Sequence, residues 1–131
     1  MAKYLLDTCT CISMFRDEGR VRETLRRVGT KNCYISEITI AELYFGLAKV
    51  EDKRRKLNDI IEVQRLFRVI PAYSSFREYG EIRYQLEHTG QRVDQFDLLI
   101  GATALHHRLT LVTSNLKHFQ RMPDLTIENW K

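Results

Sequence analysis

Short apolar runs alternate with longer amphipathic segments along this chain. The apolar runs predict buried strands over residues 3–6, 32–35, 69–70, 110–115 and 124–130. The segments between them repeat apolar residues at helical spacing and predict helices over residues 8–15, 18–28, 38–48, 51–67, 74–88, 96–105 and 116–121. This alternation is typical of an α/β fold with a largely parallel sheet.

The segment FDLLIGATAL, residues 96–105, is almost wholly apolar and carries a single acid, Asp97. We expect a helix buried on most sides, with Asp94 at its N-cap and Asp97 in its first turn, where the helix dipole stabilises a carboxylate. Taken alone, the segment supports two roles for Asp97 equally, a cap of its own helix or a ligand. Gly101 and Ala104 continue the same stripe, so we expect this helix to pack closely under the edge of the sheet.

Two further acids lie among apolar neighbours. Asp7 directly follows the predicted strand 3–6, which puts it at the carboxyl edge of the sheet, where ligands bind in open α/β folds. Glu42 borders an apolar helical arc made of Ile38, Ala41, Phe45 and Ala48. Taken singly, Glu42 is more simply explained as a boundary residue that reaches water or pairs with an arginine.

The predicted strand 110–115 ends in three small polar residues, Thr113, Ser114 and Asn115. They would reach the same carboxyl edge and could serve a site there. The alternative is an ordinary turn, because serine and asparagine are common turn residues.

Asp7, Glu42 and Asp97 together would place three negative charges around one point. Like charges in a low-dielectric setting raise one another's pKa unless a cation neutralises them. Oxygen ligands favour a hard ion such as Mg²⁺ or Mn²⁺, which meets phosphate oxygens and activates water. The three acids therefore predict a phosphodiester-cleaving metal site.

Composition narrows the class of protein only moderately. A chain of 131 residues is long enough for one domain with a real core, and its net charge of +4 permits a polyanionic partner without requiring one. Cys9, Cys11 and Cys33 lack metal-ligand spacing and indicate a reduced, cytosolic protein. We find no signal peptide and no apolar run long enough to span a membrane.

Basic residues supply candidate contacts to phosphate. The run Lys53–Lys56 opens the predicted helix 51–67, and it is either a solvated face or a phosphate-contacting patch. The same helix is expected to turn Leu57, Ile60, Ile61 and Phe67 inward. Arg83 and Arg92 are further candidates for docking a phosphate backbone.

Four motifs occur in one order along nearly the whole chain: LLDT at 5–8, ITIAELYFGL at 38–47, FDLLIGATAL at 96–105 and LVTSN at 111–115. In these motifs the chain resembles PIN-domain ribonucleases, and among them the VapC-type toxins of bacterial type II toxin–antitoxin pairs. The resemblance implies a single PIN-like domain over 1–131, with three layers and a mostly parallel sheet of four or five strands between helices. It also implies a homodimer and Mg²⁺- or Mn²⁺-dependent cleavage of structured RNA, often a tRNA, in the cytoplasm. A cognate antitoxin would wrap the toxin with its C-terminal segment, block the acidic site and build a higher toxin–antitoxin assembly.

The family's three acids correspond to Asp7, Glu42 and Asp97 of this chain. The resemblance gives the role of orienting ligands, water or substrate to Thr8, Thr113, Ser114 and Asn115. The chain departs from the family at two positions: Cys9 stands where asparagine is usual, and His118 stands where an acid is common. Asp94 could supply the missing charge, although the N-cap role is favoured.

These departures keep a second hypothesis open, that of a catalytically weak PIN scaffold that serves as an RNA- or antitoxin-binding module. A metal titration distinguishes it, since a competent site binds Mn²⁺ through all three acids. A DNA-directed nuclease is also conceivable. A receiver-type phosphoacceptor fits poorly, because it requires paired acids at one strand end and a late lysine.

Overall fold

Five short strands form one sheet in the order β3-β2-β1-β4-β5, and all neighbouring strands are parallel. The computed structural model describes residues 2–131. The strands are β1 (Tyr4–Leu6), β2 (Cys33–Ser36), β3 (Arg68–Ile70), β4 (Thr110–Val112) and β5 (Ile127–Glu128). The α-helices are α1 (Thr8–Phe15), α2 (Val21–Val28), α3 (Glu37–Lys49), α4 (Lys53–Leu66), α5 (Phe76–His88), α6 (Gln95–His106) and α7 (Leu116–Phe119). Two 3-10 turns, η1 (Thr30–Asn32) and η2 (Tyr73–Ser75), complete the chain.

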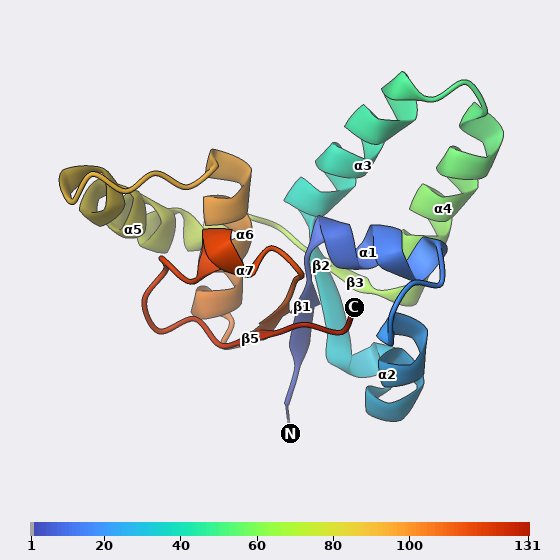
Figure 1. Cartoon of the computed structure of the whole chain (residues 1–131), viewed down its shortest axis with the longest axis horizontal. Helices are drawn as coiled ribbons and strands as arrows, with labels where there is room; N and C mark the ends of the chain where they lie inside the picture. The colour runs from blue at the N-terminus through green and yellow to red at the C-terminus, as the bar shows by residue number, and fades with distance from the viewer. Residues whose placement is uncertain (1) are drawn as a thin grey trace.

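The sheet is buried on both faces, as a parallel sheet requires. Successive side chains of a strand point to opposite faces, so Leu6 belongs to one core and Leu5 to the other. The core around Leu6 takes in residues from α1, α2, α3 and α4, and the core around Leu5 takes in residues from α5, α6 and α7. The prediction of a three-layer α/β fold with a parallel sheet is therefore confirmed (Figure 1).

Because the strands are parallel, their carboxyl ends meet at one edge. β1 runs into α1 at Asp7, β2 runs into α3 at Ser36, and β4 ends at Val112. Figure 1 shows α3 and α4 projecting together from the body of the molecule, while α5 and α6 lie on its other side. The predicted strand 110–115 is shorter than expected, and Thr113–Asn115 form the segment between β4 and α7.

Most of the apolar arc on α3 faces solvent, and only Ile38 is half-buried against the core. Phe45 is 64% exposed, and Ala41 and Ala48 are also exposed, whereas Thr39 and Leu43 are the buried residues of this helix. On α4, Ile60 is buried as expected, but Leu57 and Ile61 are exposed. Periodicity identifies an apolar face but not whether anything covers it. The α3–α4 pair therefore presents an apolar surface to solvent.

The central helix α6 is buried along most of its length, as its composition predicts. Its close packing partner differs from the expectation. A methyl group built on Gly101 would overlap the end of the Met122 side chain and contact the Phe119 ring, so the small residue accommodates the segment around α7 and not the sheet edge. Ala104 does lie in the core against the sheet, together with Leu109 and Leu111. No helix within residues 2–131 is long and apolar enough to cross a membrane.

Candidate active site

Asp7 is held at the end of β1 by donors from two sides. Its Oδ1 accepts the backbone N–H of Thr8 at 2.8 Å, which makes Asp7 the N-cap of α1, and its Oδ2 accepts the Thr113 hydroxyl at 2.8 Å. The residue is 2% exposed. Burial raises the pKa of this carboxyl above its ordinary value, and the hydrogen bonds from Thr113, Thr8 and Cys9 oppose that rise. The carboxylate is thus fixed in place but costly to ionise.

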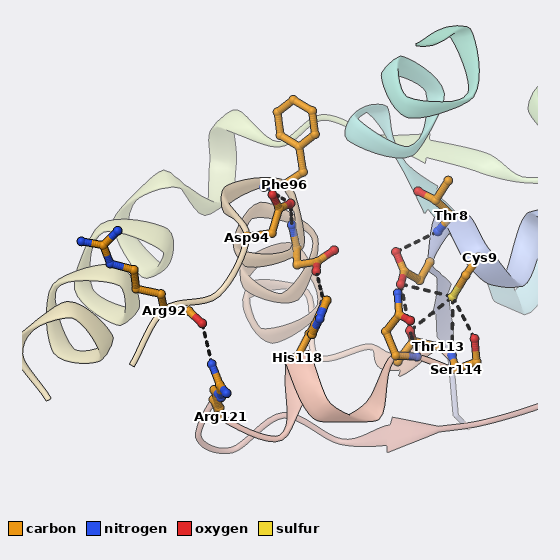
Figure 2. A network of polar contacts seen from close by, with 12 residues as sticks. Thr8, Cys9, Arg92, Asp94, Phe96, Thr113, Ser114, His118 and Arg121 are labelled. Carbon is orange, nitrogen blue, oxygen red and sulfur yellow. Dashed lines mark hydrogen bonds and ion pairs between the residues drawn. The ribbon is translucent and has the colours of Figure 1, made fainter. Parts of the chain in front are cut away.

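Cys9 takes part in holding this carboxylate. Its Sγ donates to Asp7 Oδ2 at 3.5 Å, lies 3.5 Å from the Thr113 hydroxyl, and accepts the Ser114 N–H at 3.5 Å and the Ser114 hydroxyl at 3.4 Å. Figure 2 shows Cys9, Thr113 and Ser114 gathered at this corner of the site. The thiol therefore links α1 to the segment after β4.

Glu42 is joined to the same corner through Thr8. The Thr8 hydroxyl donates to Glu42 Oε1 at 2.5 Å and lies 3.1 Å from the Thr39 hydroxyl. Burial raises the pKa of the Glu42 carboxyl above its ordinary value. The negative charges of Asp7 and Asp97 raise it further, while the bond from Thr8 lowers it. Thr8 thus holds Glu42 where the charges of the other acids affect its pKa.

Asp97 lies in the first turn of α6 and is 9% exposed. Asp94 is the N-cap of this helix, since its Oδ2 accepts the N–H groups of Phe96 at 3.1 Å and Asp97 at 3.3 Å. The cap role expected of Asp94 is therefore observed, which leaves the Asp97 carboxylate free for other partners. Burial raises the pKa of the Asp97 carboxyl, and the charge of Asp7 raises it further, while the hydrogen bond from His118 lowers it.

His118, which stands where the family commonly has an acid, contacts Asp97. Its Nδ1 lies 2.8 Å from Asp97 Oδ2, and Figure 2 shows the imidazole reaching from α7 to the start of α6. The pattern of the sequence contains no signal for this contact, because the two residues are 21 positions apart and on different elements. The sequence singled out His118 only because it departs from the family motif, and this did not predict its partner.

The segment after β4 serves mainly to support the acids. The Thr113 hydroxyl, which is buried, donates to Asp7 and accepts the N–H of Asn115 at 3.0 Å. Ser114 contacts Cys9, and Asn115 is exposed. This segment therefore forms an ordinary turn, which was one of the two predicted roles, and it also supports Asp7.

The two arginines expected to dock phosphate differ in their surroundings. Arg83 is engaged on its own helix, where its Nε donates to Glu87 Oε2 at 3.0 Å and its Nη1 donates to the Tyr79 hydroxyl at 2.8 Å. The backbone carbonyl of Arg92 accepts Nη1 of Arg121 at 2.6 Å. Sequence patterns did not indicate Arg121, which lies beside Arg92 in the fold (Figure 2).

The donor set suits a hard divalent cation. Asp7, Glu42 and Asp97 offer carboxylate oxygens, and burial raises the pKa of each. The charge of Asp7 raises the pKa of Glu42 and Asp97 further, a cost that a cation would relieve. Within residues 2–131, no group of three or more His, Cys, Asp or Glu side chains is arranged so that it could hold a metal ion as it stands. Mg²⁺ typically keeps several waters and uses one or two carboxylates, so such an ion does not need all three acids in contact with it.

The chain is similar in sequence and in fold to several known proteins. Residues 4–125 match the PIN domain family. The chain is 34% identical to ribonuclease VapC2 of Rickettsia felis over 97% of each chain, and 33% identical to the tRNA(fMet)-specific endonuclease VapC of Salmonella typhimurium over 99% of each. A DNA-bound VapBC structure from Salmonella typhimurium matches with a TM-score of 0.91 at 32% identity over all of both chains. VapBC2 from Rickettsia felis, bound to a promoter DNA fragment, matches with a TM-score of 0.87 at 31% identity over 98% of each chain.

Proposed function

This chain belongs to the PIN domain family, and from that premise we propose that it is the toxin of a type II toxin–antitoxin pair. Its activity is that of a metal-dependent endoribonuclease that cleaves structured RNA, with tRNA as the substrate class. The observation that supports the proposal is the electrostatic coupling of three acids near the carboxyl edge of a parallel sheet. The charge of Asp7 raises the pKa of both Glu42 and Asp97, and the charge of Asp97 raises that of Glu42. Relatives at about one-third identity that span nearly the whole chain are named ribonucleases or endonucleases.

Asp7, Glu42 and Asp97 are the proposed metal ligands, with Mg²⁺ as the ion and Mn²⁺ as a substitute. When bound, the ion supplies a more acidic water and a positive charge against the phosphorane and the leaving oxygen. Each of the three carboxylates keeps unused lone pairs, because a carboxylate offers about four acceptor sites and none here has more than three hydrogen bonds.

The remaining residues of the site orient these ligands. Thr8 fixes both Asp7, through its N–H, and Glu42, through its hydroxyl. Thr113 and Cys9 hold the second oxygen of Asp7. Because these partners are themselves anchored at strand ends, they keep the carboxylates in one geometry, which is what electrostatic catalysis needs. Ser114 and Asn115 complete this supporting segment, and Asn115 is exposed to an incoming substrate.

An antitoxin is the proposed protein partner. A groove of about 360 Å³ runs between α1, α2 and α4, and it is lined by Met14, Phe15, Arg22, Leu25, Arg26, Asp59, Glu62 and Leu66. Apolar walls with a charged rim suit an amphipathic segment of a partner chain. The two solved structures compared above are VapBC complexes. We further propose that the toxin forms a homodimer, joins a higher toxin–antitoxin assembly and acts in the cytoplasm.

Sequencing the RNA ends produced when the protein is induced in cells tests the proposal. Wild-type protein should generate a small set of new ends in tRNA, and Asp97→Asn should generate none. If both proteins leave the same RNA ends as uninduced cells, the alternative of a weak scaffold that binds RNA or antitoxin replaces the endonuclease. Neither departure from the family favours that alternative structurally, since Cys9 and His118 both contact acids of the site.

A further inference from the structure

His118 of α7 and Asp97 of α6 form a hydrogen-bonded pair at the edge of the site. The Nδ1 to Oδ2 distance is 2.8 Å, and the side chains are 56% and 12% exposed, respectively. An ionised carboxylate has only acceptors, so Nδ1 is the donor. Both the neutral ring with its proton on Nδ1 and the imidazolium provide that donor. The contact is therefore available whether or not the ring is charged.

The position of His118 is fixed by the packing of the residues that follow it. Phe119 is fully buried and Met122 is 3% exposed, and both lie against Gly101 one turn beyond Asp97 on α6. Arg121 adds a second tie, its Nη1 donating to the carbonyl of Arg92 in the loop that leads into α6. The α7 segment is thus docked on α6 by apolar contacts and on the preceding loop by a hydrogen bond.

We propose that His118 is a positioning residue, which α7 holds rigidly so that its Nδ1–H fixes the orientation of the Asp97 carboxylate for metal binding. An acid at this position would add negative charge to the site. Histidine instead adds a donor that restrains one oxygen, Oδ2, and leaves Oδ1 without a bond from it. The site thereby lacks the negative charge of a fourth acid, but its third acid, Asp97, is held in a more fixed orientation. This inference rests on the proposed function, since it takes Asp97 as a ligand.

Groups that support a metal ligand without touching the metal typically change metal affinity by roughly 10–100-fold when they are removed. Because His118 lies on the surface and makes a directional contact, its loss should weaken metal binding without unfolding the protein. Asparagine offers a discriminating replacement. Its amide nitrogen is attached to Cγ, as Nδ1 is, so His118→Asn retains a donor at nearly the same place.

The test is a titration of the full-length, antitoxin-free protein with Mn²⁺ alone, followed by electron paramagnetic resonance, with melting temperatures measured in parallel. His118→Ala should weaken Mn²⁺ binding by roughly 10–100-fold. The Mn²⁺ affinity of His118→Asn should stay within about threefold of wild type, which is about 0.65 kcal/mol. All variants should have the melting temperature of wild type. His88→Ala is the matched control, since His88 is an exposed histidine on α5.

Two results would overturn the inference. One is unchanged Mn²⁺ affinity in His118→Ala, and the other is an equal loss in His118→Asn and His118→Ala, which would show that the Nδ1 donor is not what matters. The proposed function fails in a different way. It fails if wild type does not bind Mn²⁺, or if Asp97→Asn binds it as tightly as wild type does.

Discussion

The Thr8 hydroxyl donates a 2.5 Å hydrogen bond to Glu42 Oε1, and the Thr8 N–H donates to Asp7 Oδ1 at 2.8 Å. One residue at the start of α1 therefore connects two acids that lie 35 positions apart (42 − 7). A bond of this kind to a charged group contributes roughly 1.5–3 kcal/mol. Thr8 thus orients Glu42 relative to Asp7.

Thr8→Val should separate these functions, because valine keeps the volume and the backbone N–H but lacks the hydroxyl. We expect Glu42 to lose its fixed orientation and the rate of RNA cleavage to fall by roughly 10–100-fold, with Asp7 still capped. Single-turnover cleavage measures the change. Thr126→Val, at an exposed residue before β5, is the control and should cleave normally. Equal rates for the two variants would remove Thr8 from the site.

The burial of Asp7 predicts a pH-dependent cost to the metal-free fold. Its pKa in the folded chain is raised above 3.8, so the folded protein holds this proton more tightly than the unfolded protein does. The resulting stabilisation is complete below pH 3.8 and is lost as the pH rises through the folded pKa. At pH 7 the ionised carboxylate therefore destabilises the metal-free protein.

Asp7→Asn removes that ionisation. In the presence of EDTA at pH 7, the variant should melt a few degrees above wild type, and the difference should shrink towards pH 3. Added Mg²⁺ should raise the melting temperature of wild type only. Thermal melts across this pH range give the answer. A variant that melts below wild type at pH 7 would contradict the stated effect of burial.

Several parts of the site could be predicted from the sequence because their signals are local. Asp7 follows a short apolar strand, and Asp97 follows a capping acid at the head of an apolar helix; both patterns depend on a few neighbouring residues. Glu42 is joined to Asp7 through Thr8, although the arc it borders is exposed at Phe45. The order and type of the strands and helices follow from the same local periodicity.

Other parts depend on contacts between distant segments, which periodicity does not encode. The packing of Met122 on Gly101 and the bond from His118 to Asp97 both need the fold that brings α7 onto α6. The exposure of Leu57 and Ile61 has a similar origin, since whether an apolar face is covered depends on the rest of the assembly.

Gly101 provides a test of how α7 is docked. Alanine is favoured over glycine in a helix by about 1 kcal/mol, but overpacking costs about 1–3 kcal/mol. Gly101→Ala should therefore lower the free energy of unfolding by about 1 kcal/mol, because the new methyl group displaces the Met122 side chain. In a Met122→Ala background the same change should be neutral or stabilising. Urea denaturation of the four proteins measures the coupling, and additive effects would contradict this packing.

Arg92 provides a test of RNA docking. Its side chain is exposed in the loop that leads to Asp94 and Asp97. If it contacts a phosphate, Arg92→Gln should weaken RNA binding and reduce the slope of log affinity against log salt by about 1. Arg108→Gln changes an exposed arginine in the turn before β4 and should leave the slope unchanged. Identical slopes for the two variants would exclude Arg92 as a phosphate contact.

The most direct test is the rate at which the purified, antitoxin-free protein cleaves tRNA as Mg²⁺ is added. The account predicts that Asp7→Asn, Glu42→Gln and Asp97→Asn each lower the Mg²⁺-dependent rate by at least about 100-fold. The control Asp124→Asn, at an exposed turn with positive φ, should cleave at the wild-type rate. Cleavage at the wild-type rate by any of the three site variants would contradict the assignment of these carboxylates as the catalytic centre.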